Sequence, residues 1–564
     1  MIRTLKNDFA PINRIPPEVL TSIPGSWHKT HKSGDLIKLT HVCRAWREIF
    51  ISCSSLWTRF YCTDADKTRV YLERSGSSPI HLHLRGVEHL SPQGPFLQII
   101  PRAMGRLESL CVEPSSGLGD LIAHLSCPAP LLKRLSIGQS SQPTSRNNPA
   151  LTTTLFNGNL SLLHVLCLYH VRTELPWRNM VNLTSFTLGR VPLGKAPIRR
   201  LLDFFESAPH LCEIKLYFIA LTSGGQNGRL VSLTRLKSVI ISGDQPTSLF
   251  LDHLLIPAGA DLQTELELPR RIEDHLPRSL DNLRNLPDFT QLNLGLNEWH
   301  STLQFTGPNG GVCMISDGSG DIITGPVLEF LARFDTSTTN HLEVTYYDPP
   351  SEYLLGQALL PMKNLHSLTV LRCENLLPII HVLNPDISSS SILICPKLEE
   401  LRVYIYREED FGVDRGVEMA AARASRGAKL KFVRVVSSRK HVPVDVSELC
   451  RYVSCVEYDF KGGEEVGDYD DHPIFCRGKS IRTYHCCGAS TSTFCILNAF
   501  VFVTEIRTSR LHSLAIVRYK MQLDFPHISP VFAFLFALSR FPVFLSKHTR
   551  IRLLLDSSFV SLAL

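Results

Sequence analysis

The sequence lacks the apolar segments that direct a chain into a membrane or a secretory pathway. Its N-terminus, MIRTLKNDFAPINRIPPEVL, holds no apolar run long enough for a signal peptide. The most apolar stretch, at 530–545, is interrupted by Arg540 and Pro542 and is shorter than the roughly 20 apolar residues that span a bilayer. We therefore expect no membrane segment.

The sixteen cysteines show no repeated short spacing of the kind that marks a disulfide framework or a series of zinc knuckles. Together with the missing signal peptide, this favours free, mostly buried thiols and a cytoplasmic and/or nuclear location. The densest group of potential metal ligands fits paired zinc ligands only loosely, so we interpret it as structural and expect no metal: Cys450, Cys455, Cys476, His485, Cys486 and Cys487.

Short enzyme signatures are also missing. The tripeptide at 478–480 has the end of a phosphate-binding P-loop, but Pro473 stands where that loop needs a glycine. Segment 316–327 begins with calcium-loop oxygens, but Ile322 and Leu328 replace the central glycine and the bidentate glutamate. Neither a G-x-S-x-G nor an H-E-x-x-H motif occurs. We expect no catalytic residues and no cofactor.

The formal net charge of +6 is unevenly distributed. Residues 491–564 carry eight lysines and arginines against three acidic residues, which leaves the preceding chain almost neutral. A near-neutral body has no bulk electrostatic reason to bind nucleic acid, so we expect no such partner. The basic, apolar tail also lacks the leucine pattern described next, and a misread exon boundary explains it as readily as a genuine domain does.

A short pattern recurs from about Arg106 onward, with apolar residues at its first, fourth and sixth positions. It predicts a short strand with one buried face, whose preceding turn is anchored by the first apolar residue. Consecutive windows mostly begin 20–33 residues apart, a spacing typical of leucine-rich repeats that stack to bury a continuous core. The ten windows are LESLCV (Leu107), LKRLSI (Leu132), LHVLCL (Leu163), LTSFTL (Leu183), LCEIKL (Leu211), LKSVII (Leu236), FTQLNL (Phe289), LHSLTV (Leu365), LEELRV (Leu398) and LKFVRV (Leu430).

Other elements are predicted between these strands. Helices are expected at 198–210, which stops at a proline, and at 417–427, which ends on Gly427. Segment 299–325 does not fit the repeat, and its turn residues at 308–311 predict an inserted hairpin. Along the strands, alternate side chains face away from the core and suit either a protein-binding face or a plain soluble surface: Glu213, Lys215, Tyr217, Glu400, Arg402 and Tyr404.

An amphipathic helix is predicted at 36–50, LIKLTHVCRAWREIF, where apolar residues recur every three to four positions. Upstream, Pro16-Pro17 suit a helix start and Glu18 suits the positive end of its dipole. We expect Pro24-Gly25 to end that first helix early, before a loop at 26–34. The open question is whether these helices serve only their own core or also dock a partner.

Segment 12–57 resembles an F-box. That motif begins Leu-Pro-x-Glu-(Ile/Leu)-Leu and continues with Asp-Leu and a helix in which Trp follows Val-Cys by three residues. The matching residues are IPPEVL at 15–20, Asp35-Leu36, Val42-Cys43 and Trp46, with a loop longer than is typical. Residues 12–490 as a whole resemble basidiomycete F-box proteins with irregular leucine-rich repeats, most clearly at LTHVCRAWREIF, SSLWTRF and MAAARASRGAKLKFVRVV.

The resemblance implies a fold, a partner and contact residues. It implies an α/β protein in which a small all-helical F-box precedes an irregular leucine-rich-repeat solenoid of short parallel strands alternating with helices. The F-box would dock the Skp-family adaptor of a cullin–RING ubiquitin ligase, and the repeats would hold an unknown protein substrate. The contact residues implied are Ile15, Pro16, Val19, Leu20, Leu39 and Val42, with Leu36, Cys43 and Trp46 packing inside the F-box.

On this interpretation the chain is a substrate receptor rather than an enzyme. The alternative is a ligase-independent protein-binding scaffold of the same fold. The expected domains are an F-box at 1–62, a connecting helix and strand at 63–105, the repeats at 106–490 with the inserted hairpin near 299–325, and the tail at 491–564.

Overall fold

A computed structural model gives the fold of the protein. The chain divides into two compact units, residues 1–489 and 490–564, and each is considered by itself. The structure describes residues 15–27, 34–61, 65–85, 100–113, 118–138, 150–151, 155–173, 180–193, 197–220, 229–266, 272–286, 288–296, 300–317, 331, 334–346, 351–373, 375–387, 392–405, 412–437, 447–460, 550–555 and 558–563.

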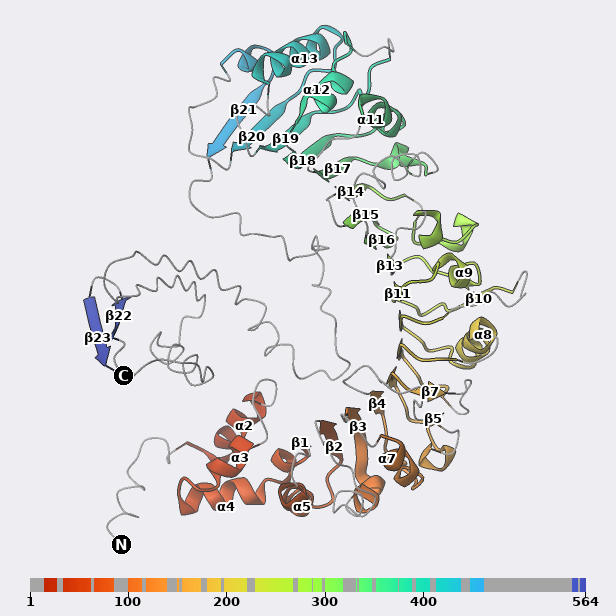
Figure 1. The fold of residues 1–564 in the computed structure, drawn as a ribbon, viewed down its shortest axis with the longest axis vertical. Coiled ribbons are helices and arrows are strands. Elements are labelled where there is room, and N and C mark those ends of the chain that lie inside the picture. Colours follow the sequence, from red (N-terminus) through yellow and green to blue (C-terminus); the bar gives the residue numbers. More distant parts are fainter. Residues whose placement is uncertain are drawn as a thin grey trace. The chain divides into compact units, whose positions relative to one another are not determined.

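A single sheet of seventeen strands runs through the first unit (Figure 1). All pairs of neighbouring strands are parallel except the two that β15 forms with β14 and β16, which are antiparallel. The α/β class predicted from the sequence is therefore present as a large, mostly parallel sheet. In spatial order the strands are β1 (Arg59–Tyr61), β2 (Ile80–Arg85), β3 (Leu107–Glu113), β4 (Arg134–Gly138), β6 (Val165–Tyr169), β8 (Ser185–Gly189), β9 (Glu213–Tyr217), β11 (Ser238–Gly243), β13 (Ala260–Leu266), β16 (Gly310–Asp317), β15 (His300–Gly307), β14 (Gln291–Leu296), β17 (His341–Tyr346), β18 (Ser367–Cys373), β19 (Glu400–Ile405), β20 (Phe432–Ser437) and β21 (Cys455–Phe460).

Each of the ten leucine windows forms a strand, as predicted, and its first apolar residue is buried. In most of the windows that residue also closes the turn before the strand: the Leu163 amide donates to the Leu160 carbonyl at 3.0 Å, and the Leu211 amide to the Ala208 carbonyl at 3.2 Å. The leucine side chain thus fixes the turn by burial while the backbone fixes it by hydrogen bonding.

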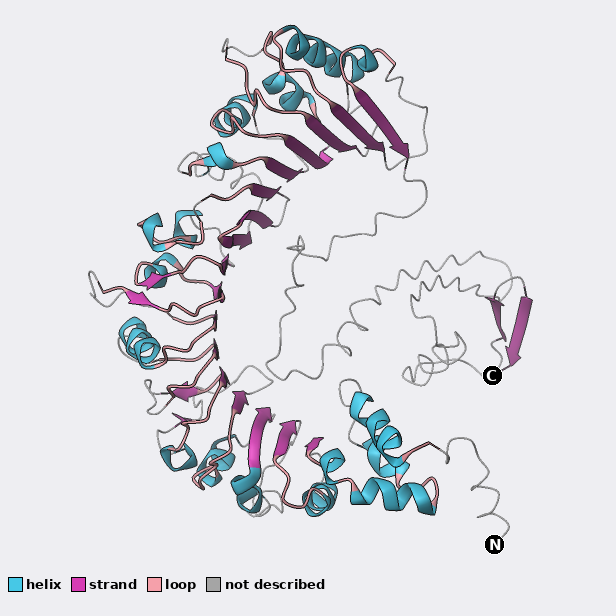
Figure 2. Cartoon of the chain, turned by 180° about the vertical axis from the view of Figure 1, so that it is seen from behind, coloured by secondary structure: helices cyan, strands magenta, loops and turns pink. Residues whose placement is uncertain are grey.

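The described helices and turns that connect the strands lie on one face of the sheet; the other face, which none of these connections covers, is called the open face below (Figures 1 and 2). The predicted helices are present as α8 (Pro197–Ser207) and α13 (Val413–Ser425), and Gly427 follows α13 with a positive φ of 79°. The remaining elements of the repeats are α5 (Ala65–Arg74), α7 (Leu118–His124), α9 (Ser248–Leu251), α11 (Glu352–Leu359), α12 (Leu377–Leu383), the short strands β5 (Ala150–Leu151), β7 (Arg172–Thr173), β10 (Val231–Ser232) and β12 (Leu254–Leu255), and the 3₁₀ turns η3 (Met104–Arg106), η4 (Leu155–Gly158), η5 (Ile272–His275), η6 (Leu280–Asn282), η7 (Thr336–Thr338) and η9 (Leu449–Arg451).

The insertion is a three-strand meander built into the sheet. The chain goes from β13 to β14 and returns through β15 and β16, so β16 pairs with β13 and β14 pairs with β17. Residues 308 and 309 form the turn between β15 and β16, where the sequence predicts a hairpin. Gly310 is required there, because its φ is 104° and a Cβ would lie 2.3 Å from the Ala260 carbonyl oxygen.

In the second unit, the described residues form one antiparallel pair, β22 (Arg550–Leu555) and β23 (Ser558–Ala563). The apolar stretch at 530–545 lies outside the described residues. Among the helices that the structure describes, none has both the length and the apolar character needed to cross a bilayer.

One buried cation ties neighbouring helices together. Arg423 of α13 is fully buried, and its guanidinium donates to the carbonyl oxygens of Leu383 (3.4 Å), Ile394 (2.9 Å) and Cys395 (2.7 Å). Leu383 ends α12, so the guanidinium satisfies a carbonyl that the helix itself leaves without a donor. Burial lowers the pKa of Arg423, and an arginine stays charged in spite of such a shift.

We expect Arg423→Ala to lower the free energy of unfolding by about 3–5 kcal/mol, because it leaves a cavity and removes the donor from the buried Leu383 and Ile394 carbonyls, while the Cys395 carbonyl keeps the Leu398 amide. Arg426→Ala is the matched control: this exposed residue one turn later pairs with Asp386 at 2.9 Å and is expected to contribute less than about 1 kcal/mol. Thermal unfolding of both variants measures the difference. Equal, small shifts would contradict a structural role for the buried guanidinium.

A pH dependence follows from His275, which is completely buried with its Nδ1 2.9 Å from the Thr264 hydroxyl. Burial lowers the pKa of His275 to about 3. Between pH 6.5 and 3 the unfolded chain binds a proton here that the folded chain does not, so stability falls as the pH falls through this window. At pH 5.5 the loss is about 1.4 kcal/mol relative to pH 7.5. His275→Gln should remove this part of the pH dependence in unfolding measurements, and an unchanged dependence would contradict the assignment.

Candidate partner-binding surfaces

The N-terminal helices begin where the sequence predicts but are divided differently. The first, α2 (Pro17–Trp27), starts at its proline and carries Glu18 in its first turn. It continues through Pro24 and Gly25, so the prediction that these two residues end it was wrong. A proline inside a helix loses its amide donor and crowds the carbonyl four residues before it, but its φ is helical, so the helix can continue past it at a cost in stability.

The segment at 36–50 is two helices rather than the single helix that its periodicity predicts. They are α3 (Gly34–Leu39) and α4 (Arg44–Ser52). Cys43 between them is extended, with φ −155° and ψ 174°, and its Sγ accepts a hydrogen bond from the Trp46 amide at 3.5 Å. The Thr40 hydroxyl donates to the Ile37 carbonyl, and Arg47 Nε donates to the Thr40 carbonyl at 3.0 Å. These side-chain bonds stabilise the break.

Two of the three predicted packing residues lie in the core. Leu36 is 5% exposed, and Trp46 packs edge-on against Phe50 with ring centroids 5.6 Å apart. Cys43 is half-buried and caps α4. The 3₁₀ turn η2 (Ser54–Trp57) closes this core, because Trp57 Nε1 donates to the Phe50 carbonyl at 2.8 Å.

The six predicted contact residues differ in accessibility. Val19 and Val42 are 51% and 58% exposed, far more than is usual for valine, and Pro16 is also exposed. Ile15 and Leu39 are half-buried against the core. Leu20 is only 2% exposed, so in this conformation it supports α2 from inside and offers no surface to a partner. Of the six, Val19 and Val42 are therefore the aliphatic side chains that are most accessible to a partner.

A known family accounts for this arrangement. The F-box-like family model matches residues 12–63. This segment is an F-box-like domain. The match covers α2, α3, α4 and η2 and extends to β1, so the domain ends in a strand and is not all-helical as the sequence predicts. No curated protein matches the chain.

The second candidate surface is the open face of the sheet beyond the F-box-like domain. Its alternation follows the sequence-based expectation: Glu213, Lys215 and Tyr217 are half-exposed, between buried Ile214 and Leu216. Strand β19 repeats this alternation, with Glu400, Arg402 and Tyr404 half-exposed between buried Leu401 and Val403.

The same polar arrangement occurs twice on this face. Glu213 accepts from the Ser185 hydroxyl on the neighbouring strand and pairs with Lys215, both at 2.7 Å. Burial opposes ionisation of Glu213, but these two hydrogen bonds outweigh it and lower the carboxyl pKa. Glu400 is bound in the same way by Ser367 and Arg402, both at 2.9 Å, and its pKa is lowered for the same reasons. The strands at both places are therefore held together by a charge-assisted network.

Aromatic rings lie flat on the open face beside this network. Tyr169 of β6 and Tyr217 of β9 stack with centroids 6.3 Å apart, and Gly189 of β8 lies between them in the register. A Cβ at Gly189 would lie 2.1 Å from the Tyr169 ring, so the glycine creates the space in which that ring rests on the sheet. Beyond the strand ends, the guanidinium of Arg190 lies 4.5 Å from the centre of the Phe218 ring.

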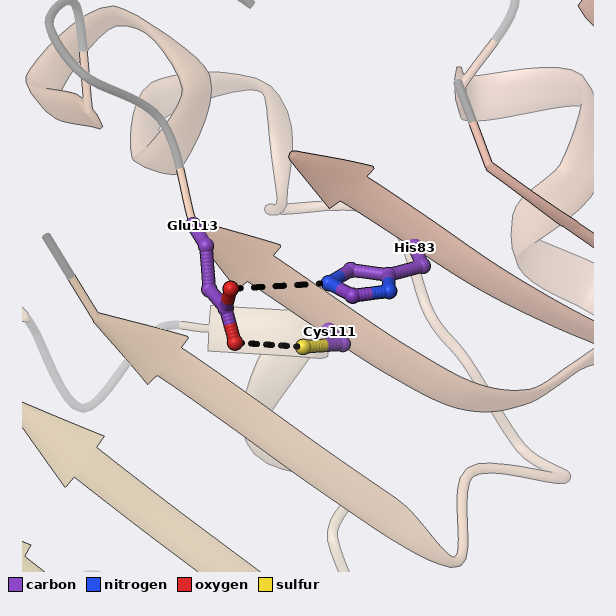
Figure 3. A group of neighbouring side chains, drawn as sticks. All are labelled: His83, Cys111 and Glu113. Atoms are coloured by element: carbon purple, nitrogen blue, oxygen red, sulfur yellow. Dashed lines mark hydrogen bonds and ion pairs between the residues drawn. The ribbon is translucent and has the colours of Figure 1, made fainter. Parts of the chain in front are cut away.

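A histidine, a cysteine and a glutamate meet near the start of the sheet (Figure 3). His83 Nε2 lies 3.7 Å from Glu113 Oε2, and Cys111 Sγ lies 3.6 Å from Glu113 Oε1. The three ligand atoms are within 4.8 Å of one another and are of the types that zinc prefers. Cys111 is disulfide-bonded, however, and a disulfide sulfur is not the thiolate that zinc needs. The cluster therefore does not support a metal site.

The expectation of free, mostly buried thiols holds only in part. Nine described cysteines remain thiols, but Cys111 does not, and Cys450 and Cys455 are exposed. The other members of the group at 450–487, like the lysine and serine at 478–480, lie outside the described residues. The sequence could not reveal the cluster with His83, because its members come from two strands that only the fold brings together.

The described part of the chain offers surfaces rather than a ligand cavity. Its two best-formed cavities have volumes of about 10 and 20 Å³, and both are lined by core side chains. One lies among Leu376, Leu401 and Leu430, the other among Leu331, Leu342 and Leu368. Spaces of this size hold at most about one water molecule, far below the volume of a small-molecule site.

We expect Gly189→Ala to displace the Tyr169 ring from the sheet, because the new methyl group occupies the ring position. The aromatic stacking with Tyr217 is lost, at a cost of about 0.5–1.5 kcal/mol. Near-ultraviolet circular dichroism reports the ring environment, and thermal unfolding reports the cost. Gly105→Ala is the control, since a Cβ there meets no atom within 4 Å. An unchanged tyrosine signal in Gly189→Ala would contradict the arrangement.

Proposed function

We propose that the protein is the substrate-recognition subunit of a Skp–cullin–F-box ubiquitin ligase. The F-box-like match at 12–63 carries this proposal, and the exposure of Val19 and Val42 within the matched segment supports it. Both side chains are apolar and accessible within the matched segment, as residues that contact a partner have to be. The adaptor would cover them and extend the core that Leu36 and Trp46 begin.

We further propose that the sheet is an irregular leucine-rich-repeat array of the kind found in basidiomycete F-box proteins. The ten leucine windows, each a parallel strand with a buried anchor, support this proposal. The proposed domains are the F-box at 1–62, a connector at 63–105, the repeats at 106–490 and the tail at 491–564. The meander β14–β15–β16 is the main irregularity of the array.

In this role the protein does no chemistry itself. The F-box-like domain holds the adaptor and, through it, the cullin–RING assembly in the cytoplasm or nucleus. The open face of the sheet holds a target protein. The rate gain comes from proximity, since a lysine on the bound target is presented at high effective concentration to a conjugating enzyme recruited by the ligase.

The decisive test is binding of the full-length chain to a purified Skp-family adaptor. We expect Val42→Asp to weaken this binding by at least about 30-fold, which corresponds to a hot-spot residue of 2 kcal/mol. A carboxylate at that position would have to lose its water within an apolar contact. Val42 is a better choice than Leu39, because Leu39 packs against the core and its replacement also tests folding.

Val181→Asp is the matched control. Val181 is also a valine, it is 51% exposed, and it lies outside the F-box-like domain. It should bind the adaptor as the unsubstituted protein does. If Val42→Asp also binds normally, the assigned surface is wrong. If the folded, unsubstituted chain does not bind the adaptor, the ligase proposal fails and the ligase-independent scaffold takes its place.

A further inference from the structure

The first four strands carry a row of hydrogen-bond donors on the open face. The register places Arg59 of β1 beside His81 of β2, His81 beside Ser109 of β3, and Ser109 beside Arg134 of β4. Because the residues that follow them in the strands are buried in the core, these four side chains point to the opposite, open face. Four consecutive strands thus present two guanidinium groups, an imidazole and a hydroxyl in line.

The two arginines differ from the other cations described on this face. Lys215 and Arg402 are each paired with a glutamate on their own strand. Arg59 and Arg134 are exposed and make no ion pair with any carboxylate that the structure describes. Glu108 is the acidic side chain described near them, and its carboxylate is engaged by Lys133 at 3.2 Å. The row therefore has an uncompensated charge of about +2.

We propose that this row is the docking site for an acidic, extended segment of a partner protein, with two carboxylates four residues apart. The inference deepens the proposed function, on which it rests, by naming the chemistry of the target segment. Neighbouring strands lie about 4.8 Å apart, so the backbones at Arg59 and Arg134 are about 14 Å apart. An extended chain covers about 13 Å in four residues and directs both side chains to the same side.

Guanidinium groups suit such a ligand because each forms two parallel hydrogen bonds to one carboxylate. The spacing of about 14 Å favours two separate acidic side chains over one shared anion. Between the arginines, the Ser109 hydroxyl and the His81 ring face the middle of the bound segment and can donate to its backbone carbonyls.

His81 makes the site sensitive to pH. Burial lowers its pKa, and so do Arg59 and then Arg134 and Lys133, while Glu108 opposes them. A bound pair of carboxylates counteracts these cations and favours the protonated ring. Affinity should therefore rise as the pH falls from 7.5 to 5.5, a range in which glutamate stays ionised. Replacement of His81 by Gln should remove this rise.

The test uses the full-length protein and fluorescein-labelled peptides of eleven residues in a glycine–serine background. One peptide has two glutamates four residues apart, one has them three apart, and one has glutamines in their place. Fluorescence anisotropy at low salt should rank the four-residue spacing first and show no binding of the glutamine peptide. Higher salt should weaken binding, because the contacts are exposed.

We expect Arg59→Gln and Arg134→Gln each to weaken binding about three- to fivefold, and the double variant more than tenfold. Arg199→Gln is the matched control, since Arg199 is an exposed arginine on α8 and α8 lies on the other face of the sheet (Figures 1 and 2). It should bind the peptide normally. The two single variants, the double variant and Arg199→Gln should all have the same melting temperature and bind the adaptor equally.

Three results would overturn the inference: equal affinity of the double variant, no preference for the four-residue spacing, or tighter binding of a single phosphoserine peptide or a single-stranded oligonucleotide. These outcomes are separate from the proposed function. If peptide binding fails while the adaptor still binds, the acidic-segment site falls alone. If the adaptor does not bind but the spaced glutamates do, the ligase role falls and the docking face remains.

Discussion

The rest of the structure depends on the hydrogen-bonded register between parallel strands. Before most of the parallel strands, the amide that follows the anchoring leucine donates to the equivalent position of the neighbouring strand: Lys133 to Glu108, His164 to Lys133, and Thr184 to His164, each at 2.8 Å. This bond is made before the strand itself begins, so each new strand starts at the same level as its predecessor. Buried side chains then stack on buried side chains, and a continuous core forms without long-range contacts within any one repeat.

The same register organises the open face. Because the side chains alternate with period two, a fixed register places every second residue in a row that crosses the strands. The serine–glutamate–cation networks around Glu213 and Glu400, the tyrosines on either side of Gly189 and the row from Arg59 to Arg134 are all consequences. None of these groups is a motif in the sequence, since the members on neighbouring strands are 20–33 residues apart. The repeat spacing brings them together.

The turn that precedes each strand shows where sequence-based prediction reaches its limit. The windows with a leucine or phenylalanine anchor could be recognised, but β13, β17 and β21 were missed. In β17 the anchor position is held by Thr339, whose amide closes the usual turn to the Thr336 carbonyl although its side chain is polar. In β21 it is Val453, and before β13 it is Gly259 with a φ of 84°. At β17 the backbone turn persists without its usual side chain, whereas the Gly259 amide before β13 donates to the Asn309 carbonyl instead.

The meander shows a different limit. The window at Phe289 predicts the next repeat, yet β14 pairs with β17 and leaves room for β15 and β16 beside β13. Local sequence predicts the hairpin, but the choice of sheet neighbour is a long-range property.

In the F-box-like domain the helical period continues across the break at Thr40–Cys43, because a short turn keeps apolar residues three to four positions apart. Residue order therefore identified the motif but could not show which residues, such as Leu20, are buried.

The junction between the two surfaces bears on how a receptor of this kind would work. The F-box-like match does not end in a linker: it extends to β1, which pairs with β2 as the first strand of the sheet. Trp57, hydrogen-bonded to Phe50 of α4, packs against Tyr71 of α5 with centroids 4.9 Å apart, and Arg74 covers its ring at 4.4 Å. Phe60 of β1 contacts the same tyrosine at 5.2 Å. A proximity mechanism gains most when the held target cannot swing freely, because effective concentration falls as a tether becomes longer and looser. Here the packed rings of Trp57, Phe60 and Tyr71 join the F-box-like domain to the sheet without a flexible tether. In a receptor, this packing would keep the target from swinging freely.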